Sequence, residues 1–238
     1  MSYDAGNRRT IAVGRAAAAV DEGLRQYMLR VYNYMASGLA LTGIIAYLTA
    51  SSETMIQAIF GTPLMWLVML APLGFVFFLS FRINKMSFAT AQLTFWAFAA
   101  VMGLSIAWIF IAFTGASIAR VFFITAGTFA AMSLYGYTTK RDLSAWGSFL
   151  FMGLIGIIIA AVVNIFIGST ALQFAISVIG VIVFTGLTAY DTQSIKELYL
   201  ESDSQEIAGK KTVMGALRLY LDFINLFIML LQLLGNRR

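Results

Sequence analysis

The sequence predicts an all-α integral membrane protein in which seven helices cross the bilayer. Hydrophobic residues make up 60% of the 238 positions and charged residues only 11%, a balance that is too apolar for a soluble globular domain. The mean hydropathy is +0.84. Apolar segments of the length that a spanning helix needs, about 20 residues, follow one another through nearly the whole chain. We therefore expect one compact membrane domain and no separate soluble domain.

Seven apolar segments run along the chain, and each is expected to form one membrane-spanning helix. The segments cover residues 27–50, 63–81, 88–113, 117–138, 144–168, 171–194 and 213–235. Residues 1–25 precede them, are polar, and contain no apolar core of the length found in signal peptides. We therefore expect a short cytoplasmic N-terminal tail over residues 1–25, a single membrane domain over residues 26–235 and a C-terminal tail over residues 236–238.

The positions of the basic residues predict which side of the membrane each connection faces. Lysine and arginine precede the first segment and recur between the second and third, the fourth and fifth, and the sixth and seventh segments, whereas the other three connections contain neither. Because cytoplasmic loops are enriched in these residues, the N-terminus should be cytoplasmic, in the cell (inner) membrane if the source is bacterial. Seven crossings then place the C-terminus outside, although the chain ends in Arg237 and Arg238.

The seventh segment carries polar side chains that cannot all face lipid. Arg218, Asp222 and Asn225 share one side of a helix, because positions three and four apart are neighbours on a helix surface. Strongly polar groups at membrane depth face the interior of a helix bundle. We therefore expect the seventh helix to be central and surrounded by the other six. Asn164 and Gln92 are the other strong polar groups at depth, and each is expected to bond to another helix.

The chain contains no cysteine and no histidine, and their absence excludes several functions. Zinc sites built from His and Cys, haem ligation by histidine, disulfides and a serine–histidine protease all need one of these residues. The net charge of +5 is not concentrated in a basic patch with interleaved aromatic residues, so we expect no nucleic-acid partner. We also expect no enzymatic activity and no cofactor. If the protein senses pH, it must do so through carboxyl groups.

Two aspartates, Asp191 and Asp222, are the only carboxylates expected at membrane depth. Such residues are costly in a bilayer and are retained mainly for function or for tight pairing. Asp191 lies near the cytoplasmic end of the sixth segment, and Asp222 lies roughly 13 Å into the antiparallel seventh segment. If the two carboxyl groups meet, they share one proton and titrate as one unit. Alternatively, Asp222 pairs with Arg218 one turn earlier, and Asp191 caps loop amides or meets solvent.

Neighbouring side chains favour a shared site over separate roles. Tyr190 directly precedes the first aspartate, and Tyr220 and Phe223 flank the second. Arg82, which closes the second segment on the same cytoplasmic side, is the most natural cation to meet the pair and is a candidate latch. It could equally be an interfacial anchor, because long basic side chains commonly reach from helix ends to the membrane surface.

Two membrane aspartates are compatible with three functions. An intramembrane aspartyl protease needs such a pair to activate water, and Tyr190 with Asp191 resembles the first motif of the presenilin-like proteases. However, residues 219–221 replace the glycines that those proteases carry before the second aspartate, and no proline follows Pro72. A retinal protein needs a Schiff-base lysine in its last helix, and residues 213–235 contain none. The third function is an ion pathway that the pair closes while it shares a proton and opens when the proton leaves.

Two motifs resemble those of a known family, GLTAYDTQSIKELY at residues 186–199 and LRLYLDFINLFIMLLQLLG at residues 217–235. Together with the seven-segment layout, they are similar to the bacterial branch of the Bax inhibitor-1 (transmembrane Bax inhibitor motif) family over all but the N-terminal tail. The resemblance implies seven helices, with the last surrounded by six, that act as a pH-sensitive calcium leak. It also implies that Asp191 and Asp222 hydrogen-bond to close the cytoplasmic side, and that Arg82 can latch onto Asp191.

The sequence and the resemblance together predict a pH-gated cation leak. The resemblance implies calcium as the permeant ion, with Asp191 and Asp222 as transient ligands, and carboxylate oxygens suit this hard cation. The expected partners are therefore the lipid bilayer and calcium ions. In an alternative function, which the resemblance also implies, the protein binds and restrains a membrane-bound ATP-dependent protease, with residues 1–22 as the handle.

Overall fold

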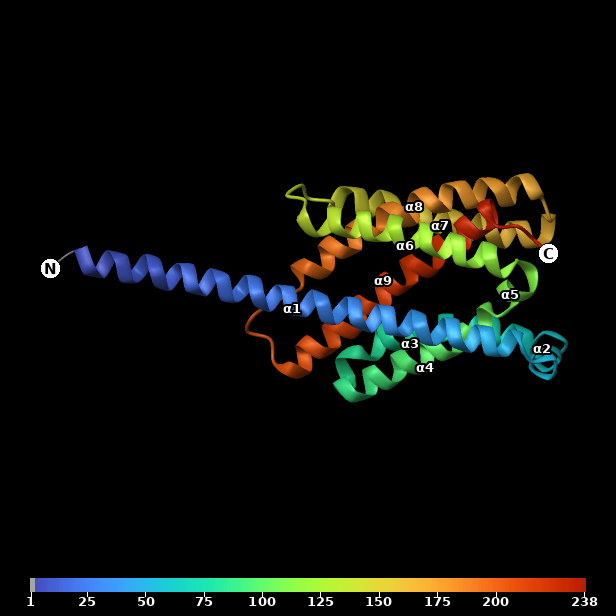
Figure 1. Ribbon diagram of the computed structural model, residues 1–238, viewed down its shortest axis with the longest axis horizontal. Helices are drawn as coiled ribbons and strands as arrows, with labels where there is room; N and C mark the ends of the chain where they lie inside the picture. The colour runs from blue at the N-terminus through green and yellow to red at the C-terminus, as the bar shows by residue number, and fades with distance from the viewer. Residues whose placement is uncertain (1–2) are drawn as a thin grey trace.

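The structure is a bundle of α-helices (Figure 1). The computed structural model describes the backbone of residues 3–238 and the side chains of residues 22–238. Its elements are α1 (Tyr3–Ala50), α2 (Glu53–Phe60), α3 (Leu64–Arg82), the 3₁₀ turn η1 (Ile83–Lys85), α4 (Phe88–Ile106), α5 (Trp108–Ala112), α6 (Gly115–Thr138), α7 (Ser144–Ile167), α8 (Thr170–Glu197) and α9 (Gln205–Leu234). The described residues form no named strand, and the predicted all-α fold class is confirmed.

Seven stretches of helix are long and apolar enough to cross a membrane, as the sequence predicts. They are Glu22–Ala50, Leu64–Lys85, Phe88–Ala112, Gly115–Thr138, Ser144–Ile167, Thr170–Glu197 and Gln205–Leu234. The third stretch is interrupted at Ala107, where the N–H of Ala107 bonds to the carbonyl of Leu104, three residues back, at 3.4 Å. Helix α4 therefore ends there and the short α5 continues the crossing.

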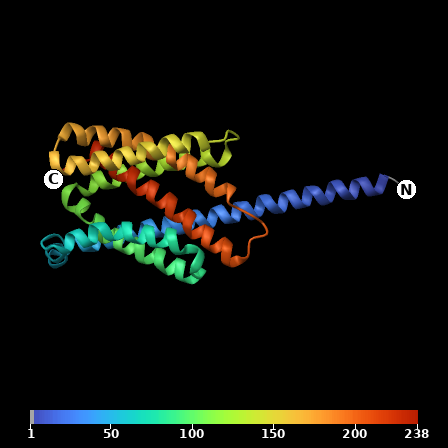
Figure 2. The ribbon, with the colours of Figure 1, turned by 180° about the vertical axis from the view of Figure 1, so that it is seen from behind.

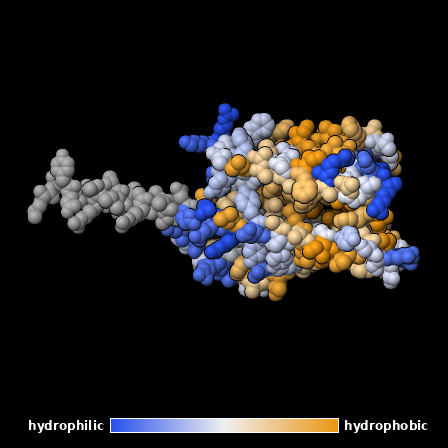
Figure 3. All heavy atoms as spheres, in the orientation of Figure 1, coloured by the Kyte–Doolittle hydropathy of each residue, from blue (hydrophilic) through white to orange (hydrophobic). Residues whose placement is uncertain are grey.

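The face of the bundle shown in Figure 3 is mostly apolar over its middle and more polar towards its two ends. The side chains of Phe123, Phe81 and Phe166 are 73%, 78% and 85% exposed. Extended apolar patches of this kind are rare on water-soluble monomers and mark surfaces that meet a membrane or a partner. With seven spanning helices, the chain is an integral multi-pass membrane protein.

Helix α1 begins inside the segment that the sequence predicts to be a tail. It starts at Tyr3, whereas the predicted boundary with the membrane domain lies at residue 26. Residues 3–25 contain no proline and several alanines, a composition that favours helix, so the backbone continues without a break into the first span. Residues 1 and 2 of the predicted tail lie outside the described part of the chain.

Helix α9 begins at Gln205, eight residues before the predicted start of the seventh segment at residue 213. Charged residues in these first turns lower the hydropathy, so the apolar run starts later than the helix does. Specific contacts hold the first turns in place. Ser204 caps the helix by accepting a hydrogen bond from a first-turn amide at 3.3 Å. Glu206 accepts one from the N–H of Phe88 at 2.9 Å. The start of α9 is thereby fastened to the N-terminus of α4.

Helix α9 is the most buried of the seven spans, because 56% of its most apolar stretch is buried, against 11% for α7. It packs against α1, α4, α6 and α8. The remaining long helices form outer pairs, α3 with α4 and α7 with α8, and α9 crosses diagonally between these pairs in Figure 2. Enclosure of α9 by all six other spans stays a prediction.

Tyr220 joins α9 to α1 and α4. Its hydroxyl oxygen is 2.6 Å from Oγ1 of Thr42, and the Thr42 hydroxyl donates to the carbonyl of Ala99 at 2.7 Å. Because the only Thr42 hydroxyl proton is used in that bond, Tyr220 is the donor to Thr42. The ring of Tyr220 also packs edge-on against Phe98, with 5.1 Å between the ring centroids. These contacts fix one side of α9 in the core.

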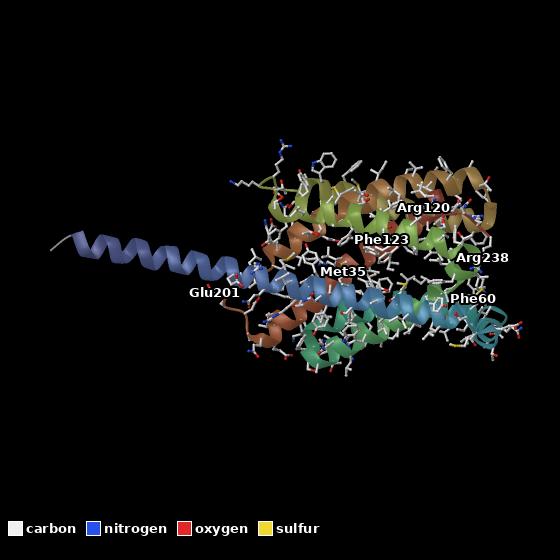
Figure 4. The ribbon with its side chains drawn as sticks, in the orientation of Figure 1. Met35, Phe60, Arg120, Phe123, Glu201 and Arg238 are labelled. Carbon is white, nitrogen blue, oxygen red and sulfur yellow. The ribbon has the colours of Figure 1, made fainter. Side chains whose placement is uncertain are left out.

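The C-terminus lies at the end of the bundle that also holds the α5–α6 connection (Figure 1). The backbone N–H of Asn236 donates to a hydroxyl group of α6 at 2.9 Å, and Arg120 of α6 donates to the carbonyl of Leu234 at 3.1 Å. In Figure 4, Arg238 and Glu201 mark the two opposite ends, called here the α5–α6 end and the α8–α9 end. Helix α9 therefore crosses the whole bundle, as the sequence predicts.

Candidate functional site

A cavity of about 790 Å³ opens between α3, α7, α8 and α9. It lies on the side of α9 towards α3 and α7, which do not pack closely on α9. Most of its lining is apolar, and its polar side chains are Ser148, Tyr190, Asp191, Arg218, Asp222 and Asn225. All of the site residues predicted from the sequence except Arg82 line this cavity.

Helical spacing places the polar side chains of α9 on the face that lines the cavity. Arg218, Asp222, Asn225 and Met229 follow one another at intervals of four, three and four residues, and residues at such intervals share a face. Tyr220 lies two residues before Asp222, about 200° around the helix, and therefore faces α1 and α4. Tyr220, whose proximity to Asp222 in the sequence favours a shared site, therefore lies outside the cavity.

The two aspartates approach each other from α8 and α9. Both side chains line the cavity together with that of Arg218. Among the described residues, no ion pair joins Arg218 to Asp222. Asp222 is only 4% exposed, and its Oδ2 has no hydrogen-bond partner in the described part of the chain. A buried oxygen without a partner costs free energy. Binding a proton or a cation at this oxygen would remove that cost.

Arg82 lies outside the cavity. It is exposed in the last turn of α3, and it forms no ion pair with a carboxylate of the residues that the structure describes. The cation that lines the cavity with the aspartates is Arg218, which shares the polar face of α9 with Asp222. The prediction that Arg82 is the natural cation of the pair is therefore corrected, whereas its role as a latch stays a prediction.

Two glycines let neighbouring helices approach the end of α8 closely. A side chain at Gly136 of α6 would overlap the backbone of Ala189, and one at Gly147 of α7 would overlap the ring of Tyr190. Small residues at helix contacts allow such close approach in membrane proteins. The ring of Tyr190 is thereby seated against α7, while Asp191, the next residue, lines the cavity.

The residues that follow in the same motif fasten α8 to other helices. The hydroxyl oxygens of Thr192 and Ser133 are 2.9 Å apart, and that of Ser133 is 2.6 Å from the hydroxyl oxygen of Tyr32, which links α8 to α6 and α1. The amide group of Gln193 bonds twice to the backbone of the α6–α7 connection, at 2.8 Å each time. Lys196 donates to a carbonyl in the last turn of α6 at 2.9 Å.

Asp142 is a further carboxylate near this end of the bundle, and it lies outside the membrane-spanning helices. It is exposed in the α6–α7 connection. The hydroxyl group and the N–H of Ser144 donate to its carboxylate, the N–H at 2.8 Å, and these bonds lower the pKa of Asp142. Because a lowered pKa keeps this carboxyl group ionised in neutral and mildly acidic solution, Asp142 cannot be the origin of a response in that range.

The cavity offers a cation few protein ligands. The described residues contain no group of three or more His, Cys, Asp or Glu side chains that could hold a metal ion. Asp191 and Asp222 provide two carboxylates, and Asn225 adds an amide oxygen. Since calcium takes about six to eight oxygen ligands, a calcium ion in this cavity would keep much of its water.

Sequence reasoning missed the residues that position the aspartates, above all Thr192, Gln193, Gly136 and Gly147. The signal for the first two was present, because consecutive helix positions point about 100° apart, so the polar run from 191 to 193 had to face three different neighbours. The two glycines gave no such signal among the 20 glycines of the chain. Asn164 does bond to another helix as predicted, to Gln173 of α8 at 3.3 Å.

The chain has relatives in several bacteria. The model of a protein family described as "Inhibitor of apoptosis-promoting Bax1" matches residues 24–238. An uncharacterized protein of Rickettsia prowazekii is 48% identical over 230 residues, which cover 97% of this chain and 98% of the relative. The inner membrane protein YbhL of Escherichia coli K12 is 48% identical over 219 residues, which cover 91% of this chain and 94% of the relative. An uncharacterized membrane protein of Streptococcus pyogenes is 36% identical over 219 residues, with 91% and 95% covered.

Proposed function

The chain belongs to the Bax inhibitor-1 family, and we propose that it is a pH-sensitive calcium leak of a bacterial inner membrane, with a cytoplasmic N-terminus and no enzymatic activity. One observation supports the proposal: Asp191 and Asp222 come from two neighbouring helices and line, together with Arg218, one cavity. The carboxyl groups are the proposed pH sensor and the transient ligands of the ion.

The charge of the cavity links proton binding to cation binding. When Asp191 and Asp222 share one proton, their single negative charge is balanced by Arg218, and the cavity is neutral. When that proton leaves, two carboxylates face one guanidinium group, and the cavity carries one net negative charge. Because a negative cleft with low-dielectric walls concentrates cations, release of the proton prepares the cavity for a cation.

Repulsion between the two carboxylates supplies the free energy for opening. Two like unit charges about 4 Å apart repel by about 4 kcal/mol at an effective dielectric constant of about 20, which is roughly a thousandfold in an equilibrium constant. The other ionisable side chains of the cavity lining are Arg218 and Tyr190, and Tyr27 of α1 lies within reach of the charge of Arg218. The cavity lining that α3 and α7 contribute is uncharged. The aspartates are thus the groups whose protonation sets the charge of the cavity.

Calcium flux into liposomes between pH 6 and 8 tests the sensor. We expect flux of the wild-type protein to rise with pH, and Asp191→Asn and Asp222→Asn each to shift or abolish this dependence, because asparagine cannot release a proton. Asp142→Asn is the matched control, since Asp142 is exposed and outside the cavity. If both cavity variants keep the flux and the pH response of the wild type, the aspartates are not the sensor.

The same liposomes test the identity of the ion. Two carboxylates and one amide oxygen do not by themselves select calcium, so sodium and potassium fluxes are measured beside that of calcium. Calcium flux well above both supports a calcium leak. Equal fluxes of the three ions would leave a leak but remove calcium from the proposal.

The alternative function, restraint of a membrane-bound ATP-dependent protease, stays a prediction. Its proposed handle, residues 1–22, falls almost wholly on residues whose side chains lie outside the described part of the chain. Deletion of residues 1–22 distinguishes the two functions, because it should abolish an effect on the protease and leave calcium flux unchanged.

A further inference from the structure

The contact between α8 and α9 changes character along its length. On α8, the residues of the contact face, read from the aspartate towards the start of the helix, are Asp191, Leu187, Phe184, Gly180, Ser177 and Gln173. On α9 the facing residues are Arg218, Asp222, Asn225, Met229 and Gln232. The antiparallel helices therefore bring together a charged stretch, then an apolar stretch, then a stretch of amide and hydroxyl groups.

The amide and hydroxyl groups form a cluster at the α5–α6 end of the bundle. The side-chain oxygen of Gln232 accepts a hydrogen bond from the side-chain amide of Gln173 and lies 3.1 Å from the hydroxyl oxygen of Ser177, which also bonds to the carbonyl of Gln173 at 2.9 Å. Asn164 of α7 donates to Gln173 at 3.3 Å. We call these four residues the amide cluster. It joins α7, α8 and α9 through neutral polar groups.

Met229 separates the amide cluster from the cavity. It lines the far end of the cavity, and its side chain is seated on Gly180 of α8, where an added Cβ would lie 2.8 Å from Cγ and 2.9 Å from Sδ of Met229. Along the axis of α9, Met229 lies about 10 Å beyond Asp222 and about 4.5 Å before Gln232. An apolar stretch of Met229, Leu187 and Phe184 thus lies between two polar regions, and Met229 is its member next to the amide cluster.

We propose that Met229, seated on Gly180, is a second, apolar barrier on the cation pathway, between the aspartate cavity and the amide cluster. This inference rests on the proposed leak and deepens it. Apolar constrictions block ions by excluding water, and the unbranched thioether side chain of methionine can leave its seat by rotating about three bonds. The barrier contains no ionisable group, so it acts independently of pH.

The absence of cysteine from the chain allows a direct test with single-cysteine variants. Asn225→Cys reports from the aspartate side of Met229, and Gln232→Cys reports from the amide cluster. The probe is Ag⁺, a small cation that reacts with thiols, added outside liposomes; Ser202→Cys, in the exposed α8–α9 connection, reports the orientation of the reconstituted protein. Reaction is measured as loss of subsequent maleimide labelling.

With Ag⁺ at the α5–α6 end, we expect rapid reaction of Gln232→Cys and slow reaction of Asn225→Cys. Adding Met229→Ala should speed the reaction of Asn225→Cys from this end by about tenfold or more, because the constriction is then wide enough to hold water. Met229→Leu, which keeps the volume and apolar character, should retain the protection. Met152→Ala, at an exposed position on α7, is the matched control and should change nothing.

If Asn225→Cys reacts with Ag⁺ at the same rate with Met229 present and with Met229→Ala, the inference is overturned. Faster reaction in the Met229→Leu variant or in the Met152→Ala control would also overturn it. Because the Ag⁺ readout requires no calcium flux, the two proposals fail separately. If the protein carries no cation at any pH but Met229 still protects Asn225→Cys from Ag⁺, the leak is refuted and the barrier stands. If the protein leaks calcium but Met229 does not protect Asn225→Cys from Ag⁺, only the barrier is refuted.

Discussion

Gly147 and Gly156 of α7 form a matched pair that tests how Tyr190 is seated beside the aspartates. A Cβ at Gly147 would lie 2.6 Å from Cδ2 of the Tyr190 ring, whereas a Cβ at Gly156 would meet nothing within 4 Å. The same substitution to alanine therefore adds a methyl group to a tight contact in one case and to open space in the other. We predict that Gly147→Ala destabilises the protein relative to Gly156→Ala.

The magnitude follows from two opposing effects. Replacing glycine by alanine inside a helix stabilises it by about 1 kcal/mol, and this gain applies to Gly147 and Gly156 alike. Inserting a methyl group into a packed contact costs about 1–3 kcal/mol, and this cost applies to Gly147 alone. Gly156→Ala should therefore be more stable than the wild type by about 1 kcal/mol, and Gly147→Ala should fall about 1–3 kcal/mol below Gly156→Ala.

Reversible unfolding in mixed micelles of mild detergent and sodium dodecyl sulfate measures these free energies of unfolding. The control is Tyr190→Ala, which removes the ring that the added methyl group meets. In that background the difference between Gly147→Ala and Gly156→Ala should disappear, since the methyl group added at Gly147 no longer meets the Tyr190 ring. Equal stabilities of the two alanine variants in the presence of Tyr190 would refute the close seating of its ring on α7.

Two further predictions concern groups outside the cavity. Because the pKa of Asp142 is lowered, the stability that its hydrogen bonds provide is present above its unfolded pKa and is lost only as the pH falls through the lowered value. Asp142→Asn should therefore leave the flux at pH 6 to 8 unchanged, and a shifted pH response would contradict this. Tyr220→Phe removes the donor to Thr42 and should lower the free energy of unfolding by about 0.5–1.5 kcal/mol. Thr42→Ala should cost less in the Tyr220→Phe background than alone, and a fully additive result would exclude the bond.

The seven spans and the polar face of α9 were predictable from the sequence, because each depends on a strong local signal. A spanning helix needs a long apolar run, and such runs stand out against 11% charged residues. Likewise, Arg218, Asp222 and Asn225 share a face through helical spacing alone. The hypothesis that Asp191 lies beside the polar face of α9 required α8 and α9 to be neighbours, and these helices do pack together.

Other features depend on tertiary packing and left little trace in the sequence. From the sequence, Arg82 is the most natural cation to meet an aspartate pair, because the packing of α3 cannot be predicted from it. Helix α3 packs on α4, which leaves Arg82 exposed, whereas α9 carries Arg218 directly into the cavity. The early start of α9 has a similar origin, because the contact between Glu206 and Phe88 joins residues more than a hundred positions apart.

The polar groups at the α8–α9 end divide into bonded and unbonded ones, and this division favours the aspartates as the groups that respond. Thr192, Gln193 and Lys196 are hydrogen-bonded to neighbouring helices or connections, and Tyr220 is bonded on the opposite side of α9. Breaking any of these bonds leaves a buried partner unsatisfied, which opposes movement. Asp222, in contrast, keeps a buried oxygen without a partner in the described part of the chain. A proton or a cation that reaches this oxygen supplies a missing interaction, so the first response to either is expected at the aspartates and not in the network that holds them.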